Sequence, residues 1–218
     1  MARVIGCEGL HIAKLLTDTK EGATWEKPIA VPSLIAIDIK DNSEKVELYS
    51  DDKLEQVITA MTGKEVTIEL GGIEKDVLAL ISGNTYEEGV FIQSADAVAN
   101  EVALMFKAPL SRGGFRYCAL YKGVLAQEET NYKTKEGSVE GQTIKLTGVF
   151  MALENGVPYI EVDDNDKNLT PAQKAMVNSW FTKVPVFEKT TEKAPQEKED
   201  KGPQKEKTEK TVEGSVGK

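Results

Sequence analysis

Several segments of the chain alternate apolar and polar residues with a period of two, and this pattern constrains the fold more than any other feature. In residues 34–40, Ile35, Ile37 and Ile39 fall on one face. Successive side chains of a strand point to opposite sides, so this alternation is typical of a strand with one buried face. Residues 44–49, 65–70 and 143–151 alternate in the same way. The pattern therefore predicts strands in all four segments.

Turn residues are expected to separate these strands. Asp41-Asn42 lies between the first two segments, and Gly63-Lys64 precedes the third. Gly113-Gly114 is predicted to join a strand near residues 102–107 to one near residues 115–122. Asn155-Gly156 is a two-residue hairpin signal, because both residues tolerate the left-handed backbone of a tight turn.

Two helices are predicted among the strands. Residues 73–81 follow Gly71-Gly72 and place apolar residues at helical spacing. Residues 170–181 begin with Thr170 as N-cap, Pro171 at N1 and Gln173 as the capping-box partner, and their apolar face is expected to pack on a sheet. The sequence thus predicts a mainly β (α+β) fold, a β-sandwich or open barrel with one or two packed helices.

The composition changes after Phe187. Residues 188–218 contain no aromatic residue, and their eight acidic residues balance their eight lysines. The net charge of -9 therefore belongs to residues 1–187. A segment of this composition cannot bury enough apolar surface to offset its ordering entropy. We expect a folded β domain over residues 1–187 and a disordered, charged tail over residues 188–218.

The acidic balance argues against a DNA-binding protein, because phosphate neutralisation needs clustered Lys and Arg. No apolar run reaches the length of a signal peptide or a membrane span, so we expect synthesis in a cytoplasm and no membrane contact. Cys7 and Cys118 match no metal or redox spacing and are expected to be free thiols.

The chain offers little catalytic chemistry. His11 is the sole histidine, and no nucleophile motif accompanies it. Residues 163–168 resemble the start of a calcium loop, but Leu169 occupies the glycine position and Ala175 the glutamate position, which favours a polar turn. No phosphate-binding glycine motif occurs. We expect no enzymatic activity, no metal and no cofactor.

The most informative stretch is residues 115–123, with the sequence FRYCALYKG, followed by YKTK at residues 132–135 and the threonine-containing segment 143–150. This succession resembles the major tail protein family of siphophages and prophages of Gram-positive bacteria. Residues 9–18 resemble that family's opening strand, and residues 48–52 resemble its strand ending in a small residue and an acidic pair. The resemblance covers residues 9–181.

The resemblance implies a structural subunit of a bacteriophage tail tube in the virion. Subunits of this family form hexameric rings that stack into a conduit for DNA ejection, and each subunit lends strands to a continuous inner β-barrel. The implied partners are further copies of the chain and other tail proteins, namely the tape measure, the tail terminator and a tail chaperone. DNA would pass without specific binding.

In a tail tube, the negative net charge of the folded part would help DNA to pass through the lumen. A lumen lined by carboxylates repels phosphates and offers DNA no basic patch. We expect the polar faces of the alternating strands to provide this lining, and for each residue the alternative is that it faces outer solvent. The candidates are Asp38, Glu47, Glu65 and Glu69, with Thr67, Thr143 and Thr147 as neutral neighbours.

Two other functions are compatible with the sequence. The first is a tail adaptor or terminator of the same fold, which forms single rings rather than tubes. The second is a small β-sandwich that binds a carbohydrate or another ligand. In that case Tyr86, Tyr132 and Tyr159 would form a stacking platform.

Overall fold

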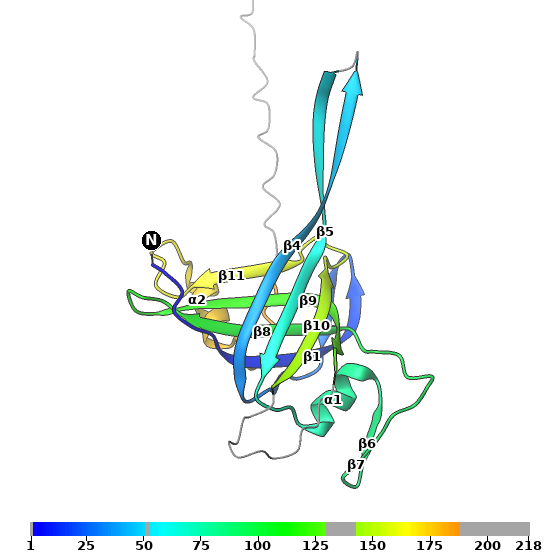
Figure 1. Cartoon of the computed structure of the whole chain (residues 1–218). Helices are drawn as coiled ribbons and strands as arrows, with labels where there is room; N and C mark the ends of the chain where they lie inside the picture. Colours follow the sequence, from blue (N-terminus) through cyan, green and yellow to red (C-terminus); the bar gives the residue numbers. More distant parts are fainter. Residues whose placement is uncertain (1, 51–52, 130–142, 188–218) are drawn as a thin grey trace, which may run out of the picture. The chain divides into compact units, whose positions relative to one another are not determined.

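The computed structural model describes residues 2–50, 53–129 and 143–187, so the predicted tail of residues 188–218 lies outside it. These residues form mainly strands with two short helices (Figure 1). The strands are β1 (Glu8–Thr19), β2 (Gly22–Trp25), β3 (Ile29–Ala30), β4 (Leu34–Ser50), β5 (Lys53–Leu70), β6 (Thr85–Glu87), β7 (Val90–Ile92), β8 (Val102–Pro109), β9 (Phe115–Gln127), β10 (Ile144–Met151) and β11 (Tyr159–Asp163). The helices are α1 (Lys75–Ser82) and α2 (Pro171–Asn178).

One large antiparallel sheet contains most of the strands. Its order is β2-β1-β8-β9-β10-β5-β4, with β3 added to β1 and β11 added to β9. Along one edge, the long strand β9 pairs with two different strands. Its first half pairs with β11 and its second half with β10. β6 and β7 form a separate hairpin. The prediction of a mainly β, α+β fold is confirmed.

The first hydrophobic core lies inside the curl of this sheet. It brings together fully buried side chains from strands at both ends of the sheet order, including Leu10 of β1, Leu104 of β8, Ile68 of β5 and Leu146 of β10. Figure 1 shows β4, β5 and β10 running across β1, β8 and β9. Helix α1 adds Val77 and Ile81 to this core. Burial of this apolar surface is the main force that holds the curled sheet together.

The second core lies on the opposite face of β1, β8 and β9. Ala13, Met105, Ala119 and Tyr121 point to this side, as the strand period of two requires. The segment that follows α2 covers them with Trp180, which is fully buried. The predicted packing of this helical region on a sheet is therefore confirmed.

Helix α2 begins as the sequence predicts. The Thr170 hydroxyl accepts a hydrogen bond from the Gln173 N–H at 3.3 Å, and the Gln173 side chain accepts one from the Thr170 N–H at 2.9 Å. Pro171 occupies the first helical position. This reciprocal capping box satisfies two N–H groups that a helix start otherwise leaves without partners.

The turn predicted at Asp41-Asn42 is wrong, and so is the strand boundary predicted at Gly63-Lys64. Both positions lie inside long continuous strands, where the β4–β5 pairing shifts register at Asn42 and Gly63. This shift is a single β-bulge, in which β5 carries Thr62 as an extra residue between Met61 and Gly63. Beyond it, residues 43–50 and 53–61 pair only with each other among the described strands and extend past β10 as a two-stranded hairpin (Figure 1).

A second bulge corrects the predicted face of Ile35. The register shifts between Leu34 and Ala36, so Leu34 takes the inward position together with Ile37 and Ile39. Ile35 turns outward and is 52% exposed. A period-two pattern cannot reveal this, because the extra residue is itself apolar.

Of the two remaining turn predictions, the one at Gly113-Gly114 is confirmed and the one at Asn155-Gly156 is correct only in part. Gly113 and Gly114 join β8 to β9 with φ angles of 85° and 80°, as the sequence predicts. Asn155-Gly156 does form a turn, and the Gly156 N–H donates to the Leu153 carbonyl at 2.8 Å. It is not a hairpin turn, however, because the flanking strands β10 and β11 both pair with β9 rather than with each other.

The contact between Gly123 and Phe150 offers a test of the β9–β10 pairing. A Cβ atom on Gly123 would lie 2.4 Å from the buried Phe150 ring. We expect Gly123→Ala to destabilise the fold, and Phe150→Leu to cost about 1 kcal/mol through the space it leaves. In the double variant the smaller side chain makes room for the methyl group. Its loss of unfolding free energy should therefore be smaller than the sum of the single losses by about 1 kcal/mol. Urea denaturation of the four proteins measures this coupling, and a value near zero contradicts the packing described.

Candidate assembly surface

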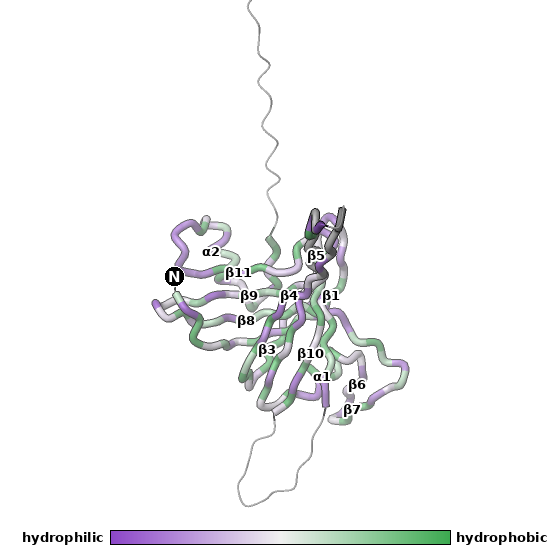
Figure 2. Tube along the Cα trace, turned by 45° about the horizontal axis from the view of Figure 1, so that its top comes forward, coloured by the Kyte–Doolittle hydropathy of each residue, from purple (hydrophilic) through white to green (hydrophobic). Residues whose placement is uncertain are grey.

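Four neighbouring strands form a layer whose outer face is not covered by other described residues. This four-strand layer comprises residues 34–41 of β4, 64–70 of β5, all of β10 and residues 122–127 of β9. Its inner face contributes Val66, Ile68 and Leu146 to the first core. We call the opposite side the open face. Figure 2 shows hydrophilic and hydrophobic residues alternating along these strands.

Most of the predicted lining residues meet on the open face. Asp38, Thr67 and Thr147 lie directly opposite one another in a single row across β4, β5 and β10. Glu65 and Glu69 flank Thr67 on the same face of β5, two residues away on either side, and all five side chains are exposed or half-buried. Strand periodicity predicts that each of these residues lies on a polar strand face. The sheet register brings residues that are far apart in the sequence together on one surface.

Two predicted lining residues stand apart from this group. Thr143 directly precedes β10 and is exposed, and it shares the parity of Thr147. Glu47 lies on the outer part of β4, opposite Val57, where the backbone is described but the Glu47 side chain is not.

Lysines interrupt the acidic pattern that the sequence suggests. Lys40 lies opposite Glu65, and Lys145 lies opposite Glu69. Oppositely charged cross-strand neighbours attract each other modestly. In these rows the open face has three carboxylates, those of Asp38, Glu65 and Glu69, and two lysines. Its net charge is therefore -1. Sequence reasoning missed the lysines because it selected acidic residues without the strand register, which alone shows what lies opposite them.

An apolar strip borders the charged rows. Val124 of β9 lies opposite Val149 of β10, and both are substantially exposed. Met151, two residues further along β10, is exposed as well. Exposed aliphatic side chains that adjoin one another are more typical of an interaction surface than isolated ones.

Both ends of the four-strand layer present unpaired strand edges. Among the described strands, β4 pairs only with β5, and residues 124–126 of β9 pair only with β10. The outer edge of β4 is approached by the Cys7 thiol, 3.8 Å from the Ile35 carbonyl oxygen. An unpaired edge displays N–H and C=O groups that can pair with another strand.

An ion pair fixes the bend where the layer leaves the rest of the sheet. Lys122 Nζ lies 3.0 Å from Asp18 Oδ2, and the other Asp18 oxygen accepts a hydrogen bond from the Glu154 N–H at 3.1 Å. The Asp18 side chain is only 7% exposed. The hydrogen bond to Asp18 raises the pKa of Lys122. This contact ties β1, β9 and the β10–β11 connection together at one point.

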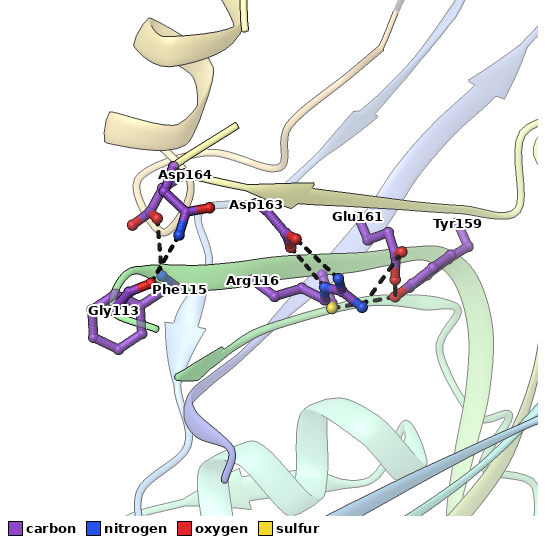
Figure 3. A network of polar contacts seen from close by, with 9 residues as sticks. Gly113, Phe115, Arg116, Tyr159, Glu161, Asp163 and Asp164 are labelled. Carbon is purple, nitrogen blue, oxygen red and sulfur yellow. Dashed lines mark hydrogen bonds and ion pairs between the residues drawn. The ribbon is translucent and has the colours of Figure 1, made fainter. Parts of the chain in front are cut away.

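The acidic run 163–168, which resembles a calcium loop, instead anchors the start of β9 (Figure 3). Asp163 accepts two hydrogen bonds from the Arg116 guanidinium, at 2.7 and 2.9 Å. Asp164 accepts one from the Phe115 N–H at 3.0 Å, and the Asn165 side chain donates to the Gly113 carbonyl at 2.8 Å. The expected polar turn is therefore confirmed. No metal-binding cluster of His, Cys, Asp and Glu occurs among the described residues.

The same network continues to Tyr159 (Figure 3). The Tyr159 hydroxyl donates to a Glu161 carboxylate oxygen at 3.0 Å and lies 3.2 Å from Cys118 Sγ. Burial raises the pKa of the Cys118 thiol to about 11. Cys7 and Cys118 are both free, as expected.

The remaining candidates from the sequence are placed as follows. His11 stacks on Phe181 with ring centroids 4.4 Å apart, which makes it a packed histidine. Tyr159 is half-buried on β11 and Tyr86 is exposed on the β6–β7 hairpin, while Tyr132 lies outside the described residues. A groove of about 400 Å³ runs beside β11 and α2, where Val162 and Met176 line it together with Asp163.

No protein-family model matches the chain, and no curated protein is significantly similar to it. No helix among the described residues is long and apolar enough to span a membrane.

The Arg116–Asp163 pair predicts a specific pH dependence. The hydrogen bond from Arg116 lowers the pKa of Asp163 below its ordinary value of 3.8. A lowered pKa in the folded state stabilises the fold above the unfolded pKa, and this stabilisation is lost as the pH falls through the folded value. Asp163→Asn should therefore reduce the free energy of unfolding at pH 7 but have little effect near pH 2.

Urea denaturation at both pH values measures this difference. Asp96→Asn is a matched control, because the Asp96 side chain is exposed and has no ion-pair partner among the described residues. An equal loss for Asp163→Asn at both pH values would show that its effect is steric rather than electrostatic.

Proposed function

We propose that this chain is a structural subunit of a bacteriophage tail tube. It assembles with copies of itself into hexameric rings that stack into the conduit for DNA ejection. Its location is the tail of the virion, and its other partners are further tail proteins. The resemblance of residues 9–181 to the major tail protein family gives the class of function, and the geometry of the four-strand layer supports it.

The observation that carries the proposal is the even number of antiparallel strands between two open edges. β9, β10, β5 and β4 alternate in direction, so the two edge strands β9 and β4 run in opposite directions. In a ring, neighbouring copies are related by a rotation about an axis that runs along the strands, and such a rotation leaves the strand directions unchanged. β4 of one copy is therefore antiparallel to β9 of the next copy. The two edges can pair, and the sheet can continue from copy to copy.

This contact is heterologous, since two different edges meet, and a heterologous contact closes into a ring when its rotation divides a full turn. Closure also removes both open edges at once, which resolves the risk of uncontrolled aggregation that exposed edges create. The open face with Asp38, Glu65, Thr67, Glu69 and Thr147 then lines the lumen. Its weak negative balance offers DNA no basic patch.

Rings must also stack to make a tube. The outer parts of β4 and β5, residues 43–50 and 53–61, extend beyond the layer and pair only with each other in the described chain. A hairpin of this kind can reach a neighbouring ring. An isolated two-stranded hairpin is only marginally stable in water, so contact with another ring would stabilise it.

The first test combines electron microscopy with cross-linking. Concentrated protein should form rings or tubes with a central hole in negative stain. For cross-linking, Ala126→Cys is combined in turn with Ala36→Cys, Asp38→Cys or Lys40→Cys, all on a Cys7→Ser background. At least one pair should give an oxidised ladder up to the hexamer on a non-reducing gel.

The variants that carry only one of these introduced cysteines are the controls and should give no ladder, because the remaining Cys118 is buried. If Asp38→Cys or a neighbouring β4 variant alone gives dimers, then two β4 edges meet symmetrically, and the ring is contradicted. Single rings that never stack would favour a tail adaptor. A monomer at all concentrations would count against the proposal and favour a ligand-binding module.

The lumen assignment has its own test in a phage that carries this chain. Glu65→Lys with Glu69→Lys places four lysines and one carboxylate on these rows, so DNA should be held and ejection should slow. Lys40→Glu with Lys145→Glu is the matched control, because it changes the same rows in the opposite direction and should not slow ejection. Measuring DNA release after receptor triggering distinguishes them. Equal release rates would place the open face outside the lumen.

A further inference from the structure

The β6–β7 hairpin and the segment that follows it carry exposed apolar and acidic side chains. We call residues 85–98 the arm. Val90 and Ile92 lie on one face of the hairpin with Glu87, while Tyr86 and Phe91 lie on the other face. Val90 and Ile92 are 57% and 52% exposed, and Val98 is 81% exposed. Glu87, Glu88 and Asp96 make no ion pair among the described residues.

The arm is held firmly at its base. The Asn100 side chain donates to the Leu80 carbonyl at 2.6 Å, and the Ser94 N–H donates to the Asn84 side chain at 3.1 Å. Lys75 of α1 lies over the Phe91 ring, 5.6 Å from its centroid. These contacts cover the Tyr86–Phe91 side near α1 and leave the face with Glu87, Val90 and Ile92 open. The arm therefore presents a positioned surface rather than a loose loop.

A surface of complementary chemistry lies at the other end of β8. Arg3, Val4, Ile5 and Arg112 form what we call the arginine patch. Val4 and Ile5 are 49% and 66% exposed. Both arginines are exposed, and neither has an ion-pair partner in the part of the chain that the structure describes. Arg3 and Arg112 are two of only three arginines in the sequence. Arginine is the cationic residue most enriched in protein interfaces.

The patch is also positioned by specific contacts. The Ser111 N–H donates to the Arg3 carbonyl at 2.8 Å, and the Arg3 N–H donates to the Ser111 hydroxyl at 2.9 Å. The Ile5 N–H donates to the Pro109 carbonyl at 3.0 Å. On its other side the β8–β9 turn is held by Asp164 and Asn165 (Figure 3). The N-terminal segment and the turn therefore form one unit.

The relative positions of arm and patch suit repeated contact. The arm leads into the start of β8, and the patch is tied to its end by the contacts of Arg3 and Ile5 with Ser111 and Pro109. They therefore lie at opposite ends of a strand of eight residues, about 25 Å long. Figures 1 and 2 agree in placing β6 and β7 on one side and the N-terminus on the other. Such an arrangement cannot close within one chain. It can form between successive copies, with the arm of each binding the patch of the next.

We propose that the arm of one copy binds the arginine patch of a second copy, with Glu87 and Glu88 facing Arg3 and Arg112 around a contact of Val90 and Ile92 with Val4 and Ile5. This inference rests on the proposed function, in which such a clasp adds a second contact between neighbours in a ring. Charge complementarity selects the partner, because the rest of the folded chain is predominantly acidic and repels the arm.

Charge exchange tests the clasp directly. The arm-reversed variant carries Glu87→Lys and Glu88→Lys, and the patch-reversed variant carries Arg3→Glu and Arg112→Glu. Each alone should raise the concentration needed for assembly by roughly tenfold or more, because like charges then meet. In an equimolar mixture of the two, the lysine arm meets the glutamate patch and the glutamate arm meets the arginine patch. Mixing should therefore restore assembly in alternating order.

Sedimentation velocity with negative-stain microscopy provides the readout. Glu21→Lys with Glu26→Lys is the matched control, since it changes the net charge by the same amount as arm reversal at exposed sites outside the arm, the patch and the turn that holds the patch. A loss of assembly from misfolding is not repaired by mixing, so recovery identifies the contact. Failure of the mixture to assemble, or equal loss in the control, overturns the clasp.

The outcomes separate the clasp from the tail-tube function. If the wild type forms tubes and both reversed variants do so at the same concentration, the clasp is overturned and the tube stands. If the wild type forms only open chains that respond to charge exchange, the clasp stands and the tube is overturned. A wild type that stays monomeric at high concentration overturns both.

Discussion

The pairing of β9 is the constraint on which the rest of the structure depends. Between its pairs with Val102 and Leu104 of β8, β9 carries one more residue than its partner. This bulge lets Leu120 and Leu125 both face the first core, although one number is even and the other odd. A bulge bends a strand and increases its twist. β9 can therefore leave the β8 side of the sheet and join β10, which is what curls the sheet around its core.

The contacts at this bend explain why it occurs at one place. Lys122 lies within the bulge and reaches Asp18, and Gly123 lies beneath the Phe150 ring. The bend also divides the outer side of the sheet into two parts. Trp180 and its neighbours cover the part over β1, β8 and the first half of β9. The part over β10, β5 and β4 stays open, and this uncovered part supplies the surface that we assign to assembly.

The sequence predicted the local features well and the connections less well. The strand alternation of residues 65–70 and 143–151 and the capping box at Thr170 depend on nearby residues, and the structure contains them. Asp41-Asn42 and Gly63 carry the residue types of turns but lie at a β-bulge inside the β4–β5 pair, because pairing between two long strands outweighs local turn preference. Bulges and cross-strand partners such as Lys40 and Glu65 depend on register, which only the folded sheet defines.

The candidate site shows the same division. Strand periodicity by itself predicts that Asp38, Glu65, Thr67, Glu69 and Thr147 lie on polar strand faces, and the fold brings them together on one surface. The arm and the arginine patch have no periodic signal, because Val90, Ile92, Val4 and Ile5 lie in short segments with ordinary composition. They matter because they lie at the two ends of β8. Their separation is set by the folded strand, and no local sequence pattern predicts it.

The lysines of the open face weaken the electrostatic potential that this surface produces at a distance. Lys40 beside Glu65 and Lys145 beside Glu69 form local dipoles, and the field of a dipole decays faster with distance than that of a single charge. At physiological salt the Debye length is about 8 Å, so little of this alternating pattern extends far from the wall. A duplex travelling along such a surface would experience a nearly flat potential, with neither wells in which it pauses nor strong repulsion that confines it to the axis.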